Sequence, residues 1–351
     1  MSLLARSLVA LDSLRERSAL DFLRERSALD SFDSPEQVAA ALARLVTTGA
    51  LALPLPGGGR TAERFLALAE VAATDLSLAR LSEGHVDALA ILAEAGRTPV
   101  PNARYGVWAA EPPDARVHAS RSPDGWILHG RKRYCSGARG LDRALVTADC
   151  EGHSRLFDVA LDHPSVHVVG DTWHAVGMAA TESLDVELDR VPVAEDRVVG
   201  APGFYLARPG FWQGAIGVAA CWYGGALGAY RTLHAQCRRG TPNEHQLAHL
   251  GAVAACCETM TTMLLDAADA IDRGLDPDED ARRRRALVVR HVVEQGCQEV
   301  LTRVGRAGGT TPLTFDRAHA RRAADLVVYL RQHHAERDLA ALGREALEIV
   351  P

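Results

Sequence analysis

The sequence lacks every short motif that would hold a nucleotide in a glycine-rich turn or present a nucleophile on one. No GxGxxG follows a strand-like run, and neither GxxxxGK[ST] nor GxSxG occurs in the 351 residues. These absences exclude a P-loop, a dinucleotide-binding turn and a serine-hydrolase elbow as the source of any chemistry. If the protein uses a nucleotide cofactor, another kind of structure must hold it.

Paired cysteines and a strong charge are missing as well. Seven cysteines, an odd number without regular spacing or a CxxC pair, exclude a disulfide framework and predict a reducing cytoplasm. Charged residues recur from Arg6 onward, so we predict no signal peptide. A net charge of −6 gives no electrostatic attraction to nucleic acid or to an anionic membrane. His245 and His249 stand four apart without a third ligand, so we predict no metal site.

One long run, Phe211–Tyr230, carries no charge. It contains five glycines and no comparable second run exists, which favours a helix buried in a bundle over a membrane span. Gly217, Gly224 and Gly228 recur at helical spacing and predict a close approach of neighbouring helices. Because such an apolar face is rarely left exposed on a soluble monomer, we also predict a homodimer or homotetramer joined through bundle helices.

Residues 1–104 carry apolar positions at helical intervals and predict an N-terminal helical domain. Ser34 followed by Pro35 is a typical helix start. Upstream, the sequence LRERSALD occurs at Leu14–Asp21 and again at Leu23–Asp30, which we interpret as a local duplication that extends a helix or an arm. Helical segments are predicted at Glu36–Thr48 and Arg64–Ala95.

Residues 105–204 change to short alternating runs separated by turn formers, which favours a compact antiparallel β barrel or sandwich. The runs are Arg116–Ser120, Trp126–His129, Arg143–Thr147, Leu156–Leu161, Val166–Val169 and Leu184–Leu188. Residues 205–351 return to helical periodicity and predict a four-helix bundle, so the fold class is α+β. Its helices are predicted at Phe211–Arg238, His245–Arg273, Asp280–Arg303 and Arg317–Leu347.

Two stretches carry a family resemblance: Asp124–Arg139 (DGWILHGRKRYCSGAR) and Thr172–Gly200, which begins TWHAVGM. Together they resemble the middle domain of the acyl-CoA dehydrogenase superfamily. The resemblance implies a helical–β–helical order and a non-covalent FAD between the β domain and the bundle. It also implies α,β-dehydrogenation of an acyl thioester with hydride transfer to flavin N5, and an electron-accepting partner.

The resemblance assigns flavin contacts to particular residues. Tyr134, Cys135 and Ser136 match the family's aromatic–X–Ser/Thr triplet against the flavin ring, and the backbone amides of Ser136–Ala138 are expected to lie open. Ala110–Pro113 matches the family's pyrophosphate loop but lacks its threonine and glycines.

Two further matches imply that each flavin site needs two subunits. Arg238–Pro242 resembles the family's Arg-x-x-Phe-Gly loop, which reaches the neighbouring subunit's FAD, although it is shorter and has no Phe. Gly305 and Gly308 resemble the glycines near the adenine end.

The family's catalytic glutamate is missing from both positions where it occurs. His333 occupies one position and Gly214 the other. His333 is therefore the candidate acid/base, and Glu336 on the next helical turn could fix its tautomer. His85 either lines the pocket or lies on a helix surface. Three functions stay open: an acyl-CoA dehydrogenase, a reduced-flavin-dependent monooxygenase, and a non-catalytic binder of flavin or acyl thioester.

Overall fold

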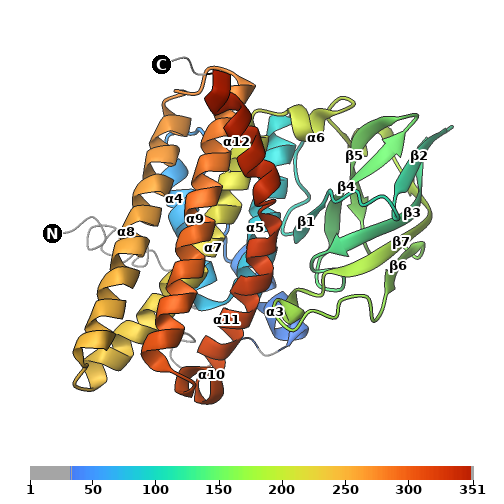
Figure 1. The fold of residues 1–351 in the computed structure, drawn as a ribbon. Helices are drawn as coiled ribbons and strands as arrows, with labels where there is room; N and C mark the ends of the chain where they lie inside the picture. The colour runs from blue at the N-terminus through green and yellow to red at the C-terminus, as the bar shows by residue number, and fades with distance from the viewer. Residues whose placement is uncertain (1–31, 33, 349–351) are drawn as a thin grey trace.

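The computed structural model describes residue 32 and residues 34–348; the LRERSALD duplication lies outside them. Long helices form one side of the molecule and a twisted sheet forms the other (Figure 1). The predicted α+β class is confirmed. One apolar core nevertheless runs through both sides, from Leu42 through Leu128 to Val300. The boundaries at 104 and 204 stay a prediction as limits of separate domains.

The N-terminal helices begin at capping residues. α3 (Pro35–Thr47) starts as predicted, because the Ser34 side chain accepts a hydrogen bond from the backbone N–H of Gln37 at 3.3 Å. The predicted segment Arg64–Ala95 is interrupted at Asp75, whose carboxylate accepts from the Leu78 N–H at 2.8 Å. The interruption separates α4 (Thr61–Thr74) from α5 (Leu76–Glu94).

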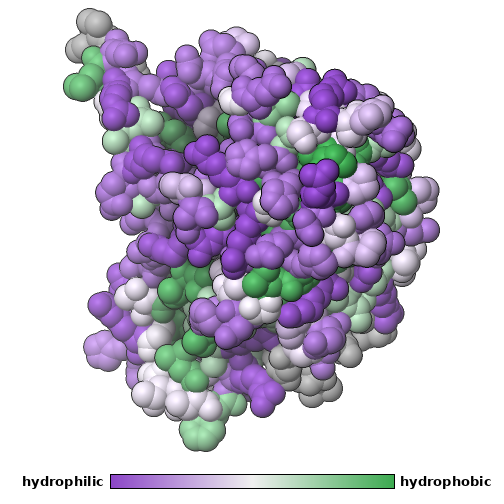
Figure 2. All heavy atoms as spheres, turned by 90° about the vertical axis from the view of Figure 1, so that its right-hand side faces the viewer, coloured by the Kyte–Doolittle hydropathy of each residue, from purple (hydrophilic) through white to green (hydrophobic). Residues whose placement is uncertain are grey.

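The described sheet has eight strands in the order β6-β7-β3-β2-β4-β5-β8, and β1 pairs with β4. The strands are β1 (Tyr105–Trp108), β2 (Val117–Ser122), β3 (Gly125–Cys135), β4 (Arg143–Cys150), β5 (His153–Ala160), β6 (Val166–Val169), β7 (Leu184–Val193) and β8 (Val198–Val199). β1 runs parallel to β4, so the sheet is mixed rather than antiparallel throughout. Figure 2 shows that the side of the molecule formed by the sheet is mostly hydrophilic, with scattered apolar patches.

Helices return at residue 204. They are α6 (Phe204–Ala207), α7 (Gly210–Arg239), α8 (Glu244–Asp272), α9 (Glu279–Gly308), α10 (Thr311–Phe315), α11 (Arg317–Tyr329) and α12 (Glu336–Glu348). α7, α8 and α9 match three predicted bundle helices to within a few residues. The glycines of α7 allow the expected close packing, since a Cβ on Gly224 would stand 2.2 Å from the carbonyl oxygen of Ala69 in α4.

The predicted fourth helix, Arg317–Leu347, is broken. α11 ends at Tyr329, a short 3₁₀ turn covers Leu330–Gln332, and His333 is extended. Arg290 of α9 donates to the carbonyl oxygen of Gln332 at 2.8 Å and so satisfies a group that the helix end leaves free. No glycine or proline marks this break in the sequence.

The apolar face of α7 is buried within one chain, against α4 and the core, which removes our reason for deducing an oligomer from it. Among the described helices, α8 is long and apolar enough to cross a membrane by length and composition alone, with 28% of the relevant window buried. It packs on α7 and α9 through residues such as Val253, Cys257 and Leu264. These contacts are those of a bundle helix.

Candidate flavin and substrate site

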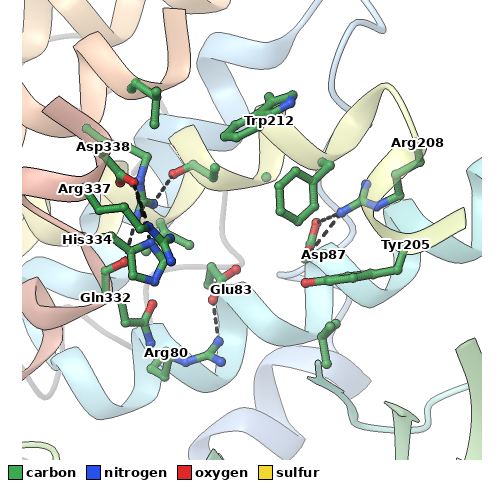
Figure 3. Close-up of a pocket in the computed structure, with 17 residues that line it drawn as sticks. Arg80, Glu83, Asp87, Tyr205, Arg208, Trp212, Gln332, His334, Arg337 and Asp338 are labelled. Atoms are coloured by element: carbon green, nitrogen blue, oxygen red, sulfur yellow. Dashed lines mark hydrogen bonds and ion pairs between the residues drawn. The ribbon is translucent and has the colours of Figure 1, made fainter. Parts of the chain in front are cut away.

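A cavity of about 290 Å³ lies where α5, α7, α9 and the start of α12 meet (Figure 3). Of the two positions to which the resemblance assigned the catalytic base, Gly214 lines it, whereas His333 does not, although its neighbours Gln332 and His334 do. Part of the wall is apolar, from Val107, Phe211, Trp212, Val218 and Leu287. Most of the other lining residues are charged, which distinguishes the cavity from a simple acyl-chain pocket.

Two carboxylates of α5 that line the cavity are held by arginines (Figure 3). Glu83 pairs with Arg80 at 2.5 Å, and burial raises the pKa of Glu83. Asp87 lies 3.2 Å from Arg208, whose guanidinium also donates to Glu94 at 2.8 Å. A Cβ on Gly214 would meet the Asp87 carboxylate at 2.8 Å, so Asp87 fills the space beside the missing side chain.

His333 points away from the cavity. Its ring is 2% exposed, packs edge-on against Trp222 and lies beside His291. Neither of its ring nitrogens has a hydrogen-bond partner among the described residues. The neighbouring His334 lines the cavity instead (Figure 3).

The predicted contact between His333 and Glu336 is wrong. The chain leaves the helix at His333, and Ala335 has a φ of +43°, so the two residues do not share a helical face. Glu336 is exposed, and the carboxylate beside His333 is that of Asp338, 4.0 Å from Nε2. Burial lowers the pKa of both His333 and His334, so both rings are neutral near pH 7.

Arg290 supplies a permanent positive charge to the same wall. It donates to the carbonyl oxygens of Ala215 and Gln332, each at 2.8 Å, and its guanidinium lies over Trp222. Burial lowers its pKa to about 10, which leaves it charged at pH 7. The sequence carried a signal for it that we did not use, because a lone arginine stands in the apolar run Ala286–Val293.

The residues that the resemblance assigned to the flavin ring lie at the end of β3. Tyr134 is 53% exposed and has a φ of +59°, a conformation that a bulky side chain rarely adopts outside special sites. Ser136 lines a small hollow that shares Arg80 and Val107 with the main cavity. Cys135 is buried, which raises the pKa of its thiol and removes it from any direct contact.

The two stretches that carry the resemblance meet at Ser136. Its hydroxyl lies 2.9 Å from that of Ser183, which lies 2.9 Å from that of Thr181. The expectation of open amides is wrong, because the N–H groups of Gly137 and Ala138 donate to the carbonyl oxygens of Thr181 and Glu182. This loop therefore offers hydroxyl groups to a ligand and no anion-binding nest.

The residues assigned to the far parts of the cofactor lie elsewhere. Ala110 is exposed in the loop after β1. Arg238 is exposed at the end of α7, while Gly305 and Gly308 belong to the last turns of α9, which ends beside α10 (Figure 1). Arg238, Gly305 and Gly308 are thus placed on the helical bundle, whereas Tyr134 belongs to β3 and Ser136 follows that strand. Among the described residues no cluster of three or more His, Cys, Asp or Glu side chains could hold a metal.

His85 neither lines the cavity nor lies on the surface. Its Nδ1 accepts a hydrogen bond from the Tyr105 N–H at 3.2 Å and so connects α5 to β1. Burial lowers its pKa to about 4. His85 is therefore a neutral structural residue that holds one wall of the site against the sheet.

Acid should weaken the fold through His85. Between pH 6.5 and 4 the unfolded chain binds a proton at this position that the folded chain excludes, so stability falls as the pH falls, by about 3 kcal/mol. His85→Asn keeps an acceptor for Tyr105 but cannot titrate. In urea titrations at pH 7 and pH 4.5, the variant should lose less stability than the parent chain. Parallel losses in the two proteins would contradict the assignment.

Comparison with known proteins identifies the fold. No family model matches the chain. A curated dibenzothiophene monooxygenase of Rhodococcus erythropolis is 32% identical over 99 residues, a segment that spans 26% of this chain and 24% of that protein. FMN-bound TdsC, a dibenzothiophene monooxygenase of Paenibacillus sp. A11-2, superposes with a TM-score of 0.78 at 20% identity, over 98% of this chain and 97% of that chain.

The butyryl-CoA dehydrogenase of Megasphaera elsdenii superposes with a TM-score of 0.75 at 18% identity, over 99% of this chain and 98% of that chain. The chain has the acyl-CoA dehydrogenase fold. The predicted resemblance is thereby confirmed, together with its helical–β–helical order. Because the acyl-CoA dehydrogenase fold is shared by these dehydrogenase and monooxygenase structures, the reaction must be argued from the site.

Proposed function

We propose that the protein is a flavin-dependent monooxygenase that oxygenates a small substrate in the cavity between α5, α7 and α12. The observation that carries the proposal is that the carboxylates lining the cavity are paired with cationic side chains. Glu83 and Asp87 are each paired with an arginine, and Asp338 lies within 4.0 Å of His334 and Arg337. Removal of an α-proton needs a base free to accept it, and no carboxylate lining the cavity among the described residues is free of a cationic partner.

A bound reduced flavin would supply the electrons with which dioxygen gives one oxygen atom to the substrate and one to water. The residues of this chain would orient the ring through Tyr134 and Ser136 and exclude water with the apolar wall. Neutral His334 can accept or return a proton at the cavity surface. His333, behind the wall, would act through its neighbours rather than on the substrate.

The cofactor is proposed as FMN rather than the FAD that the resemblance implied. The sequence retains the family match at the flavin ring, whereas Ala110–Pro113 and Arg238–Pro242 depart from the family at the parts expected to hold the pyrophosphate and adenine. TdsC, which shares the fold, is a complex with FMN. Titration of the purified protein with each flavin tests this: we expect FMN to raise the melting temperature at least as much as FAD. A rise in melting temperature with FAD alone would instead favour FAD as the cofactor.

Acyl-CoA dehydrogenation is the second candidate, and one observation favours it. Glu83 is a buried carboxylate with a raised pKa at the cavity wall, as a base for such a proton would be. It could act only if Arg80 moved away. In that case the enzyme would need an electron-accepting partner.

One pair of measurements separates the candidates. With flavin bound and oxygen removed, addition of butyryl-CoA should leave the flavin absorbance unchanged. With flavin kept reduced in air, an accepted substrate should gain one oxygen atom by mass. Anaerobic bleaching by an acyl-CoA would favour the dehydrogenase, and flavin binding without turnover in either assay would favour a non-catalytic role.

We also propose that the protein forms a homodimer or homotetramer through its bundle. The support is the outward face of α8, where Leu247, Gly251, Ala255 and Thr259 are exposed and uncharged. Light scattering should give a mass of at least two chains. Leu247→Glu should lower it.

A further inference from the structure

The arginines around the cavity differ in how their charge is balanced. Arg80 forms an ion pair with Glu83, and Arg208 forms ion pairs with both Asp87 and Glu94. Arg290 has no carboxylate within 4.0 Å among the described residues, although it is 7% exposed. A buried charge is costly unless it is paired, so an unpaired cation in a cavity wall is an unusual arrangement.

The guanidinium of Arg290 retains donors for a ligand. A guanidinium has five N–H groups, and two of them donate to the carbonyl oxygens of Ala215 and Gln332. These bonds and the Trp222 ring beneath fix its plane while the remaining N–H groups stay available. A held, planar donor set suits bidentate recognition of a carboxylate or sulfonate.

We propose that the cavity binds an organic anion, with its acidic group at Arg290 and its apolar body against Phe211, Trp212 and Leu287. The inference deepens the proposed function, since it names the substrate class of the same cavity. Leu287 and Arg290 stand three apart on α9 and both line the cavity, so an apolar and a cationic contact are adjacent.

The size of the cavity limits the apolar body. A cavity of about 150 Å³ accommodates benzene, and this one is about 290 Å³. An acid with one or two fused rings, or a short branched chain, fits this volume.

The carboxylate of Asp338 is a negative charge of the protein itself that competes with a bound anion. It lines the same wall and lies 3.8 Å from His334 and 3.7 Å from Arg337. Burial lowers the pKa of Arg290 and the negative charge of Asp338 opposes this shift, so Asp338 competes with a bound anion for that guanidinium and repels the anion. Removal of that charge should therefore strengthen anion binding, which gives the proposal a test with a gain of affinity.

The test measures binding to the full-length, flavin-free protein by calorimetry, with 2-naphthoate and its neutral counterpart 2-naphthamide as probes. We expect the acid to bind about 10- to 100-fold more tightly than the amide, as hydrogen bonds to a charged group imply. Arg290→Gln should abolish that preference. Arg303→Gln, which removes an equal charge from α9 outside the cavity lining, should leave it unchanged.

If Arg290→Gln fails to fold, the Asp338→Asn variant tests the proposal instead. Compared with the parent chain, it should bind 2-naphthoate several-fold more tightly and 2-naphthamide equally well. Equal affinities for acid and amide in the parent chain would overturn the proposal, as would an Asp338→Asn variant with unchanged preference. Because binding is read without flavin or oxygen, a preference for the acid supports the anion site whatever the outcome of the oxygenation assay.

Discussion

Replacing Gly224 with alanine is expected to lower the free energy of unfolding by about 3 kcal/mol, the upper end of the usual cost of overpacking a core. The new Cβ would lie 2.2 Å from the Ala69 carbonyl oxygen and 2.6 Å from the Ala72 Cβ. Relief of these close contacts would require α7 to move away from α4. The urea midpoint, followed by circular dichroism, should fall markedly.

A matched control is available on α12. Gly343 is exposed inside a helix, and a Cβ there would meet nothing within 4 Å. Gly343→Ala should therefore stabilise the protein by up to about 1 kcal/mol through helix propensity. If both variants unfolded at the same urea concentration, the close contact between α4 and α7 would be disproved.

The periodicity of the sequence was sufficient to predict most of the fold. Three of the predicted bundle helices, six strands and the capped start of α3 recur in the structure with shifts of a few residues. Each depends on contacts within a segment or on a repeated apolar spacing, and both are visible in one sequence. β1 and β8 were missed, because β1 pairs in parallel with a strand far along the chain and β8 has only two residues, too few to show alternation.

The two helix interruptions show where periodicity fails. Asp75 could have been recognised, because an aspartate at the start of an apolar run is a common cap. The break after Tyr329 could not, since it depends on Arg290 reaching Gln332 from another helix. That break decided the site, because it turned His333 inward and brought His334 to the cavity.

Family resemblance located the site but did not predict its charges. Of the two vacant glutamate positions, Gly214 lines the cavity and His333 lies behind its wall next to His334, which lines it, so matching motifs found the right place. The pairing of Arg208 with Asp87 and Glu94 joins segments more than a hundred residues apart, and no local pattern records it. The charges of the cavity are therefore a property of the folded chain.

Arg208→Met should lower the free energy of unfolding by about 3–5 kcal/mol, the usual cost of leaving a buried partner charge unpaired. The Arg208 side chain is 2% exposed and holds Asp87 and Glu94 of α5 against the start of α7. The loss should appear as a lower urea midpoint with an unchanged slope. It should also weaken naphthoate binding, because Phe211 and Trp212 follow directly in the chain and line the cavity.

Two comparisons distinguish a charge effect from a packing effect. Arg273→Met breaks an exposed pair with Asp269 and should cost less than about 0.5 kcal/mol. Adding Asp87→Asn and Glu94→Gln to Arg208→Met should recover most of the lost stability, since no unpaired charge then remains at that position. A combined variant as unstable as Arg208→Met alone would show that the arginine acts through its shape, and the cavity wall would then depend on packing rather than on paired charges.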